Sequence, residues 1–483
     1  MSAPQSSNNP AGRDSWLWVV ATLGVILIAI AVRWAVNFST PYPPGTDAGY
    51  YPMQTQAWLI HNRLMYDDLP LLFWMNAGLA KVLIWHGTPL DRAVLLVSRI
   101  LDSVLQPLTA IAIMATGYAW SGGRRRALAG CIAATVLAVL STPIMQMLSD
   151  FQKNSLGFVW MAAAIWACRS AMIVPTPGRW ALLVSFMILA ALTHIGAFAV
   201  TSLIICGALL IWYWKTSPHR HGRSWFAVFG GIATLITAVM LYLEPSRTEG
   251  MLRAPMGLFS AQPFQWPTLP NLVLAVIVIA VAMRWVWRER RELPDGDVAL
   301  ILAMAATLAF LIVPKRPEYF YRLSLMSTVP GSFLIAFILT RRATLDRYSW
   351  AHGALLLAGA TVIGVLAPLA APQPFIVPNA VAELQQFQRQ IREPQSTLVI
   401  APHGLEWWAG YFLQTPVGIK VKDAASSRYN RALLLQQTRA FKPPYAGPGF
   451  SPQPPGPPAP SAQRIYAGHY IEVYELRAKA SAR

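Results

Sequence analysis

The stretch "WLWVVATLGVILIAIAVRWAV" (residues 16–36) decides the fold class, because Arg33 is the single charged side chain in it. A helix of roughly 20 apolar residues is long enough to cross a bilayer, and lipid leaves the backbone no hydrogen-bond partner except itself. The apolar core exceeds the ~7–15 residues of a signal peptide, and no small-residue cleavage site follows it. We therefore expect a retained first membrane helix.

The composition of the whole chain indicates a membrane protein. Of its 483 residues 55% are hydrophobic and only 12% are charged, against about a quarter charged in soluble proteins. The net charge of +18 is carried by short groups between apolar segments, so no nucleic-acid partner is expected. Cys131, Cys168 and Cys206 fall inside apolar segments, which excludes a disulfide framework or a spaced metal cluster.

The basic groups predict the topology. They occur at residues 122–126, 175–179, 215–223, 284–291 and 340–347, and the positive-inside rule places such short loops in the cytoplasm. The chain is then a multi-pass protein of the cell (inner) membrane, with residues 1–15 as a cytoplasmic tail. About eleven membrane helices are expected, at residues 16–36, 93–120, 127–147, 155–174, 180–195, 197–214, 225–243, 269–287, 297–314, 322–340 and 349–370.

Residues 37–92 are expected to form one large outer loop. Its segment "PLLFWMNAGLAKVLIWHG" (residues 70–87) is short and interrupted by Asn76, Lys81 and His86, which suits a helix that lies in the interface. If this segment crossed the membrane, the arginine triplet at residues 124–126 would lie outside, against the rule. We therefore expect interfacial helices in this loop.

Residues 373–483 differ in character from the apolar segments. "PNAVAELQQFQRQI" predicts an amphipathic helix, "STLVIAP" a buried strand, "LEWWAGYFLQ" a second helix, and "QRIYAGHYIEVYELR" two strands about a glycine turn. Residues 443–460 are a Pro-rich loop. The predicted architecture is an all-α membrane domain over residues 16–370, followed by a small extracytoplasmic α/β domain.

The unusual polar residues gather on the predicted outer face. Asp47 lies in the first outer loop, "SDFQKNSLG" carries Asp150 and Lys153, and "THIGAF" carries His194. "PKRPEYFYR" adds further polar residues before a late helix, namely Lys315, Arg316, Tyr319 and Arg322. Ionisable groups at membrane depth are costly and mark functional sites. Carboxylates next to cations suit a general base beside a phosphate leaving group.

Each of these residues also has a structural interpretation. Asp47 could cap a helix that starts at Ala48, and Asp150 with Lys153 could form a local ion pair. His194 could satisfy a backbone carbonyl at a turn, and the cations of residues 315–322 could contact lipid headgroups. Trp407 and Trp408 could stack on sugar rings or belong to the core of their helix.

The order of these features resembles the GT-C superfamily of polytopic glycosyltransferases, which includes protein mannosyltransferases, lipid A aminoarabinose transferases and oligosaccharyltransferases. The resemblance rests on "GTDAGYYPMQTQAWL…LPLLFWMNAGLAKVL", the basic turn "GGRRRALAG", and the later "DFQKNSLG", "THIGAF" and "KRPEYFYRLSLMSTVP". It implies that Asp47, the carboxylate of the first outer loop, is catalytic and acts as a base toward the acceptor or helps to hold it. It also implies that Asp150 matches a second acidic position, sometimes a metal ligand. It also implies that Arg316, Arg322 and Lys153 bind the donor phosphate, with His194, Lys315 and Tyr319 in support.

The resemblance implies an inverting glycosyltransferase that moves a sugar from a polyprenyl-phosphate donor to a glycan, lipid or protein acceptor on the extracytoplasmic side. Asp150 is followed by Phe, Gln and Lys instead of a paired acid, so a divalent metal is not strongly indicated. Two alternatives stay open: a transporter or lipid flippase, and a noncatalytic envelope assembly protein. A transporter predicts polar residues through the depth of the membrane helices, whereas here they gather at one end.

Overall fold

The computed structural model describes residues 15–216, 269–312, 317–345, 349–419, 429–438 and 462–476, and the single positions 234, 238, 241, 242 and 249. The chain divides into two compact units. One consists of Met1–Val32, Val104–Met145 and Lys153–Leu369, and the other of Arg33–Ser103, Gln146–Gln152 and Ala370–Arg483. Each unit is therefore assembled from segments that are distant in sequence.

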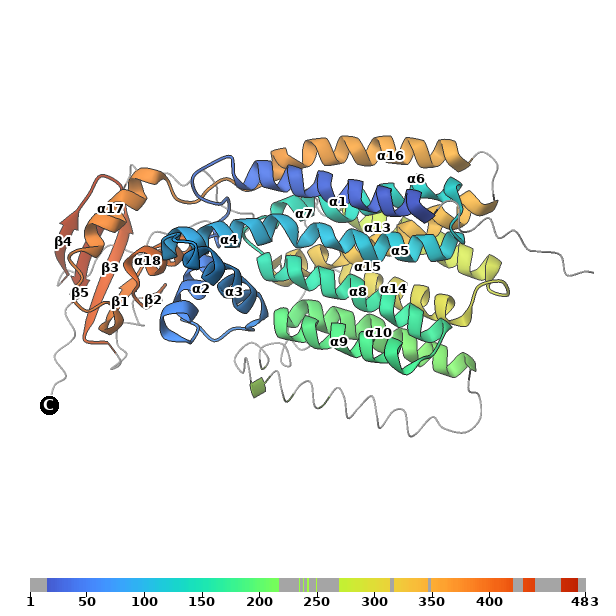
Figure 1. Ribbon diagram of the computed structural model, residues 1–483, viewed down its shortest axis with the longest axis horizontal. Coiled ribbons are helices and arrows are strands. Elements are labelled where there is room, and N and C mark those ends of the chain that lie inside the picture. The colour runs from blue at the N-terminus through green and yellow to red at the C-terminus, as the bar shows by residue number, and fades with distance from the viewer. Residues whose placement is uncertain are drawn as a thin grey trace, which may run out of the picture. The chain divides into compact units, whose positions relative to one another are not determined.

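The first unit is a bundle of helices that run side by side (Figure 1). Helix α15 packs against α5, α6, α13 and α14, while α10 packs against α9 and α14, and α16 against α6. Their bounds are α5 Thr109–Ser121, α6 Leu128–Leu140, α7 Thr142–Gln146, α8 Gln152–Ile173, α9 Pro177–Thr193, α10 Ile195–Thr216, α13 Leu269–Glu289, α14 Asp295–Ile312, α15 Pro317–Leu345 and α16 Ser349–Leu366, with the short helices η2 Gln106–Leu108, η3 Arg125–Ala127 and η5 Ala367–Ala370. Helix α1 (Ser15–Asn37) begins in this unit.

Within the described residues, seven helical segments are long and apolar enough to cross a membrane: Ser15–Asn37, Leu90–Ser121, Arg125–Gln146, Gln152–Ile173, Ile195–Thr216, Asp295–Ile312 and Arg322–Arg342. Apart from the single positions 234, 238, 241 and 242, the expected helix at residues 225–243 lies outside the described residues. Helix α1 exposes Val19, Leu23 and Leu27 by more than half of their surface, and such a surface requires an apolar solvent. The protein is therefore a multi-pass membrane protein.

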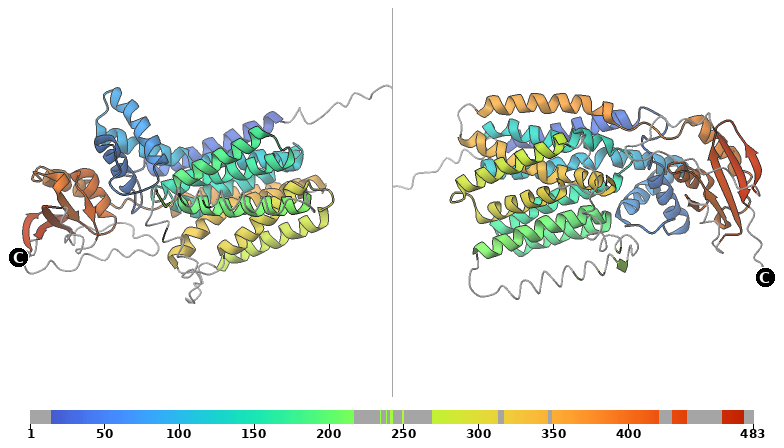
Figure 2. Two further views of the ribbon diagram at one scale, coloured as in Figure 1. Left: turned by 90° about the horizontal axis from the view of Figure 1, so that it is seen from below. Right: turned by 180° about the vertical axis from the view of Figure 1, so that it is seen from behind.

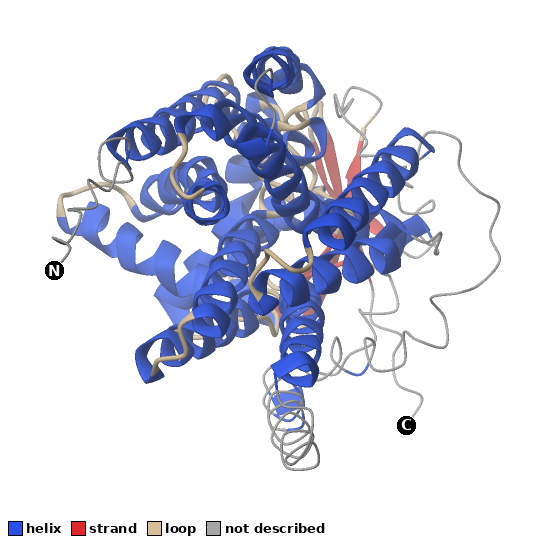
Figure 3. Ribbon diagram, turned by 90° about the vertical axis from the view of Figure 1, so that its right-hand side faces the viewer, coloured by secondary structure: helices blue, strands red, loops and turns tan. Residues whose placement is uncertain are grey.

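Helices, drawn in blue in Figure 3, predominate in the described part of the chain. Small residues allow the helices of the first unit to approach closely. A Cβ atom added at Gly130 would lie 2.8 Å from Leu339, and one added at Gly117 would lie 2.3 Å from the Cys131 sulfur. Glycine is enriched at such contacts in membranes, where packing drives association. A break in "THIGAF" is confirmed, but it falls at His194 and not at the expected Gly196, because α9 ends at Thr193 and α10 begins at Ile195.

The second unit combines the first loop with the C-terminal segment. The loop contributes α2 (Tyr50–His61), α3 (Leu71–Trp85) and α4 (Leu90–Val104). The C-terminal segment contributes α17 Pro378–Gln388, η6 Pro394–Ser396, β1 Thr397–Ile400, α18 Leu405–Leu413, β2 Val417–Gly418, β3 Arg431–Gln437, β4 Gln463–Ala467 and β5 Ile471–Leu476. Helix α18 packs against α2, α17, β1 and β2, so it joins the loop to the sheet.

The sheet has the strand order β2-β1-β3-β5-β4 (Figure 2). Strand β1 is parallel to β2 and β3, and β3 and β4 are antiparallel to β5. Leu398, Ile400 and Leu434 form a buried cluster, as alternation along a strand requires. The predicted helices α17 and α18 and the predicted strands β1, β4 and β5 are confirmed, whereas β2 and β3 were not anticipated. The Pro-rich residues 443–460 lie outside the described residues.

Candidate active site

Asp47 lies just before helix α2 and presents a half-exposed carboxylate. The N-cap of α2 is Gly49, without a side-chain cap hydrogen bond, so the structure rejects the capping interpretation of Asp47. The indole Nε1 of Trp407 instead donates a hydrogen bond to Asp47 Oδ1 at 2.8 Å. Asp47 Oδ2 has no hydrogen-bond partner among the described residues. One oxygen is thus held while the other is available to a ligand.

Asp150 holds the loop that carries Asp47. Its Oδ1 accepts a hydrogen bond from the Asp47 backbone N–H at 2.7 Å, and its carboxylate also accepts one from the Thr46 backbone. Gly45 has a φ of +103°, and a Cβ there would lie 2.2 Å from Asp150 Oδ1, so only glycine fits. Burial and the charge of Asp47 raise the pKa of Asp150 well above its usual range. The sequence correctly pairs the two acids, but Asp150 acts on the backbone.

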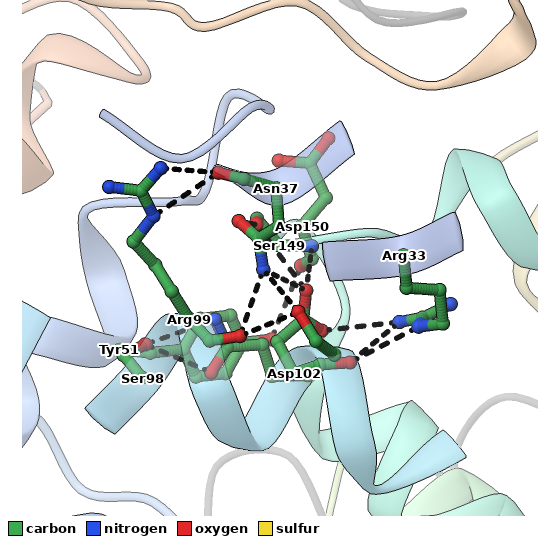
Figure 4. Close-up of polar contacts among 10 residues, drawn as sticks. Arg33, Asn37, Tyr51, Ser98, Arg99, Asp102, Ser149 and Asp150 are labelled. Atoms are coloured by element: carbon green, nitrogen blue, oxygen red, sulfur yellow. Dashed lines mark hydrogen bonds and ion pairs between the residues drawn. The ribbon is translucent and has the colours of Figure 1, made fainter. Parts of the chain in front are cut away.

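A buried polar network supports the Asp150 turn (Figure 4). Asp102, on α4, accepts a hydrogen bond from the Ser149 backbone N–H at 2.9 Å and one from Asn37 Nδ2 at 3.2 Å. Arg33 donates to the Asp102 carbonyl at 2.9 Å and lies 3.5 Å from its carboxylate. Both ionic side chains are fully buried, which is tolerated only when the pair is hydrogen-bonded on all sides.

Arg99 fixes the chain that leads from α1 to Asp47. Its guanidinium donates to the Asn37 carbonyl at 3.1 Å, the Thr40 carbonyl at 2.7 Å and the Pro41 carbonyl at 2.9 Å. A cation at the C-terminal end of a helix satisfies the free carbonyls and the helix dipole. The backbone before Asp47 is therefore held on one side by Arg99 and on the other by Asp150.

His403 and Glu406 are functional candidates that the sequence did not reveal. His403 Nε2 lies 3.6 Å from Asp47 Oδ1, and His403 Nδ1 lies 2.7 Å from Glu406 Oε1. Burial raises the pKa of Glu406 to about 7. Burial lowers the pKa of His403, but its hydrogen bond to Glu406 and the nearby carboxylates outweigh this and raise it above the usual value. The spacing H-x-x-E before an aromatic helix was the available signal, and it is too common to indicate a site alone.

The two tryptophans of α18 have different environments. Trp408 is fully buried, and its ring stacks on Phe412 at 5.9 Å between centroids. The half-buried ring of Trp407 packs edge-on against Tyr50 at 4.9 Å and Tyr66 at 5.8 Å. The core interpretation therefore holds for Trp408, whereas Trp407 belongs to the surroundings of Asp47.

The remaining candidates belong to the first unit. Lys153 is buried on α8. His194 Nδ1 accepts a hydrogen bond from the Ala197 backbone N–H at 3.1 Å, which is a helix-capping contact with an N–H and not with the expected backbone carbonyl. Arg322 is exposed on α15, and Tyr319 lies on the same helix, while Lys315 and Arg316 lie outside the described residues. The convergence of these residues with Asp47 stays a prediction.

The side chains in the described part of the chain do not form a favourable metal site. No group of three or more His, Cys, Asp or Glu side chains in the described part of the chain could hold a metal ion. The Asp150 carboxylate is occupied by backbone N–H donors, and Asp47 Oδ1 by an indole N–H. These donors compete with a cation for the same oxygens, so we derive no metal-dependent step.

Comparison with solved structures identifies the fold. An oligosaccharyltransferase from Archaeoglobus fulgidus matches with a TM-score of 0.55 and 12% identity, over 85% of this chain and 67% of that chain. ArnT from Cupriavidus metallidurans matches with a TM-score of 0.52 and 14% identity, over 95% of this chain and 98% of that chain. The arabinofuranosyltransferase AftD from Mycobacteria matches with a TM-score of 0.52 and 15% identity, over 96% of this chain and 40% of that chain. The chain has a GT-C-like membrane fold.

The sequence comparisons add little to this GT-C-like fold. No protein-family model matches the chain. A curated relative, UPF0718 protein YraQ from Escherichia coli (strain K12), is 26% identical over 117 residues, which cover 22% of this chain and 34% of that protein. The chain therefore spans about a third of the length of that relative, and the structural likeness carries the comparison.

Proposed function

We propose that the protein is a membrane glycosyltransferase that moves a sugar from a polyprenyl-phosphate donor to an acceptor on the extracytoplasmic side. The observation that carries the proposal is the Asp47 carboxylate in a GT-C-like fold: Oδ1 is held by Trp407, and Oδ2 has no partner among the described residues. The structural neighbours named above are membrane glycosyltransferases, which supports a transferase role.

In the proposed step, Asp47 Oδ2 takes the proton of an acceptor hydroxyl while the hydroxyl oxygen attacks the anomeric carbon of the donor sugar. The bond between that carbon and the phosphate oxygen breaks, and its electron pair leaves with the polyprenyl phosphate. A single displacement inverts the anomeric centre. General-base assistance of this kind contributes about 10²–10⁴ in rate.

The cations of the first unit are proposed to hold the donor phosphate. Lys153, Arg316 and Arg322 are the proposed ligands, with Lys315 nearby in the sequence. Fixed cations at a leaving phosphate stabilise the charge that develops in the transition state. The proposed donor is a lipid, so it reaches the site from the outer leaflet of the membrane.

The proposal is tested in cells that lack the gene and are complemented with the wild type, Asp47→Asn or Asp67→Asn. Asp67 is an exposed carboxylate of the same loop and provides the matched control. Mass spectrometry of the envelope should show that one class of glycan or lipid lacks one sugar and that the corresponding polyprenyl-phosphate sugar has accumulated. Both changes are expected in the deletion strain and in the Asp47→Asn strain, and neither is expected with the wild type or Asp67→Asn. A normal envelope profile with Asp47→Asn would overturn the proposal.

A further inference from the structure

His403 reaches Asp47 from the opposite part of the chain, more than 350 residues away in sequence. We propose that His403, held by Glu406, is a positioning residue that fixes the Asp47 carboxylate with Oδ2 turned to the acceptor. The inference rests on the proposed function and deepens it, because it makes the C-terminal segment part of the catalytic apparatus.

The first argument is geometric. Trp407 Nε1 and His403 Nε2 both approach Asp47 Oδ1, at 2.8 Å and 3.6 Å. The indole provides a directional hydrogen bond, whereas the longer distance to the imidazole is that of a charge interaction. Because the indole and the imidazole both contact Oδ1, they fix the orientation of the Asp47 carboxylate. Oδ2 is then left to take the proton of the acceptor.

The second argument concerns Glu406. Its side chain is 1% exposed, its Oε1 contacts His403 Nδ1 at 2.7 Å, and its Oε2 is buried without a hydrogen-bond partner in the described part of the chain. A buried carboxylate that satisfies so few of its lone pairs is costly. Its contact with Nδ1 fixes the orientation of the imidazole ring and directs Nε2 toward Asp47, which is a functional reason to retain Glu406 at this position.

The third argument is the way the turn before α18 is packed. Gly404 has a φ of +93°, and a Cβ there would lie 2.8 Å from Phe375 and 2.9 Å from the Thr46 side chain. Thr46 immediately precedes Asp47. The backbone next to His403 is therefore pressed against the loop that carries the base, so His403 has little freedom to move away.

Acidic side chains lie around His403. Glu406, Asp47 and Asp150 all favour its protonated form. An imidazolium beside Asp47 Oδ1 attracts the Asp47 carboxylate. His403→Gln removes this attraction and leaves Trp407 as the contact on that oxygen.

The test measures release of polyprenyl phosphate by the purified full-length chain in proteoliposomes, with a panel of polyprenyl-phosphate-linked sugars, between pH 5 and about 9. We expect His403→Gln to lower kcat about tenfold at pH 6, where the wild-type imidazole is charged, and by less as the pH rises and the wild-type imidazole loses its proton. The rate should recover at high pH, and KM should change less than about twofold. Glu406→Gln should shift the profile in the same direction by a smaller amount.

His469→Gln is the matched control, because His469 is exposed in the same unit, and its profile should follow the wild type. Unshifted profiles for both His403→Gln and Glu406→Gln, with an active wild type, would overturn the inference and leave the proposed function intact. A His403→Gln variant that is equally impaired at every pH would also overturn it, since that result indicates a structural role alone. A wild type that releases no polyprenyl phosphate would overturn the proposed function and this inference with it.

Discussion

Asp47 and Asp150 are both acids of loops, and their side chains have opposite surroundings. Asp150 uses its carboxylate to hold the backbone N–H groups of Thr46 and Asp47. Asp47 leaves one oxygen without a partner among the described residues and is half-exposed. At the residue scale, one acid builds the loop and the other faces the solvent, where a substrate can reach it.

Glu406 should make stability depend on pH. Burial raises its pKa in the folded protein from the usual 4.5 to about 7, so the stability it contributes is complete below pH ~4.5 and is lost as the pH rises to about 7. His403, with a raised pKa, acts in the same direction. Between pH ~5 and ~8 we expect the wild type to lose on the order of 1–3 kcal/mol more than Glu406→Gln.

Thermal unfolding of the detergent-solubilised chain, followed by tryptophan fluorescence across that pH range, measures this difference. Glu393→Gln is the control, because Glu393 is exposed and its substitution should leave the slope of the wild type unchanged. If Glu406→Gln loses stability with pH as steeply as the wild type, the assigned cause is wrong.

Arg33 should be the most sensitive position of the buried network. Arg33→Met leaves the carboxylate of Asp102 buried without its cation, which typically costs ~3–5 kcal/mol. Arg431→Met is the comparison, because its pair with Glu475 is about one-third exposed and such pairs contribute only ~0–1 kcal/mol. Denaturation midpoints of the two variants should differ accordingly, and equal losses would contradict the assignment.

At the scale of elements, the turn before α2 depends on a glycine that no side chain can replace. Gly45→Ala places a methyl group 2.2 Å from the Asp150 carboxylate in a left-handed backbone conformation, so the turn must open. We expect a loss of ~1–3 kcal/mol and at least a tenfold loss of sugar transfer, which unfolding and transfer assays measure together. Gly78→Ala is the control, because nothing lies within 4 Å of its Cβ on helix α3, and it should be neutral or stabilising; a tolerated Gly45→Ala would contradict the assigned role.

The sequence pattern predicts the helices and breaks that depend on local hydropathy and on helix-breaking residues. The helices α17 and α18 follow from local periodicity and are confirmed, and the break in "THIGAF" is found two residues before the expected Gly196. Strand β3, "RALLLQQ", has no alternating pattern because only its central residues are buried, so it was missed. His403 could not be found from sequence, since its role depends on a turn that packs against a loop more than 350 residues away.

At the scale of the whole molecule, the expected orientation assigns the first loop to the outside and the arginine turn at residues 122–126 to the cytoplasm. Arg63 and Arg125 are exposed in these segments. In a Cys206→Ser background, which removes the exposed native thiol, a membrane-impermeant maleimide should label Arg63→Cys in intact cells. Arg125→Cys should react only after the cells are opened, and the reverse pattern would contradict the orientation.

The proposed function requires Asp47 to be the base for transfer of a lipid-linked sugar, and purified chains in proteoliposomes test this most directly. We expect Asp47→Asn to lower the release of polyprenyl phosphate by about 10²–10⁴, while Asp67→Asn, altered at an exposed carboxylate of the same loop, keeps the wild-type rate. An Asp47→Asn chain that turns over within about twofold of the wild type would contradict the role of Asp47 as the base.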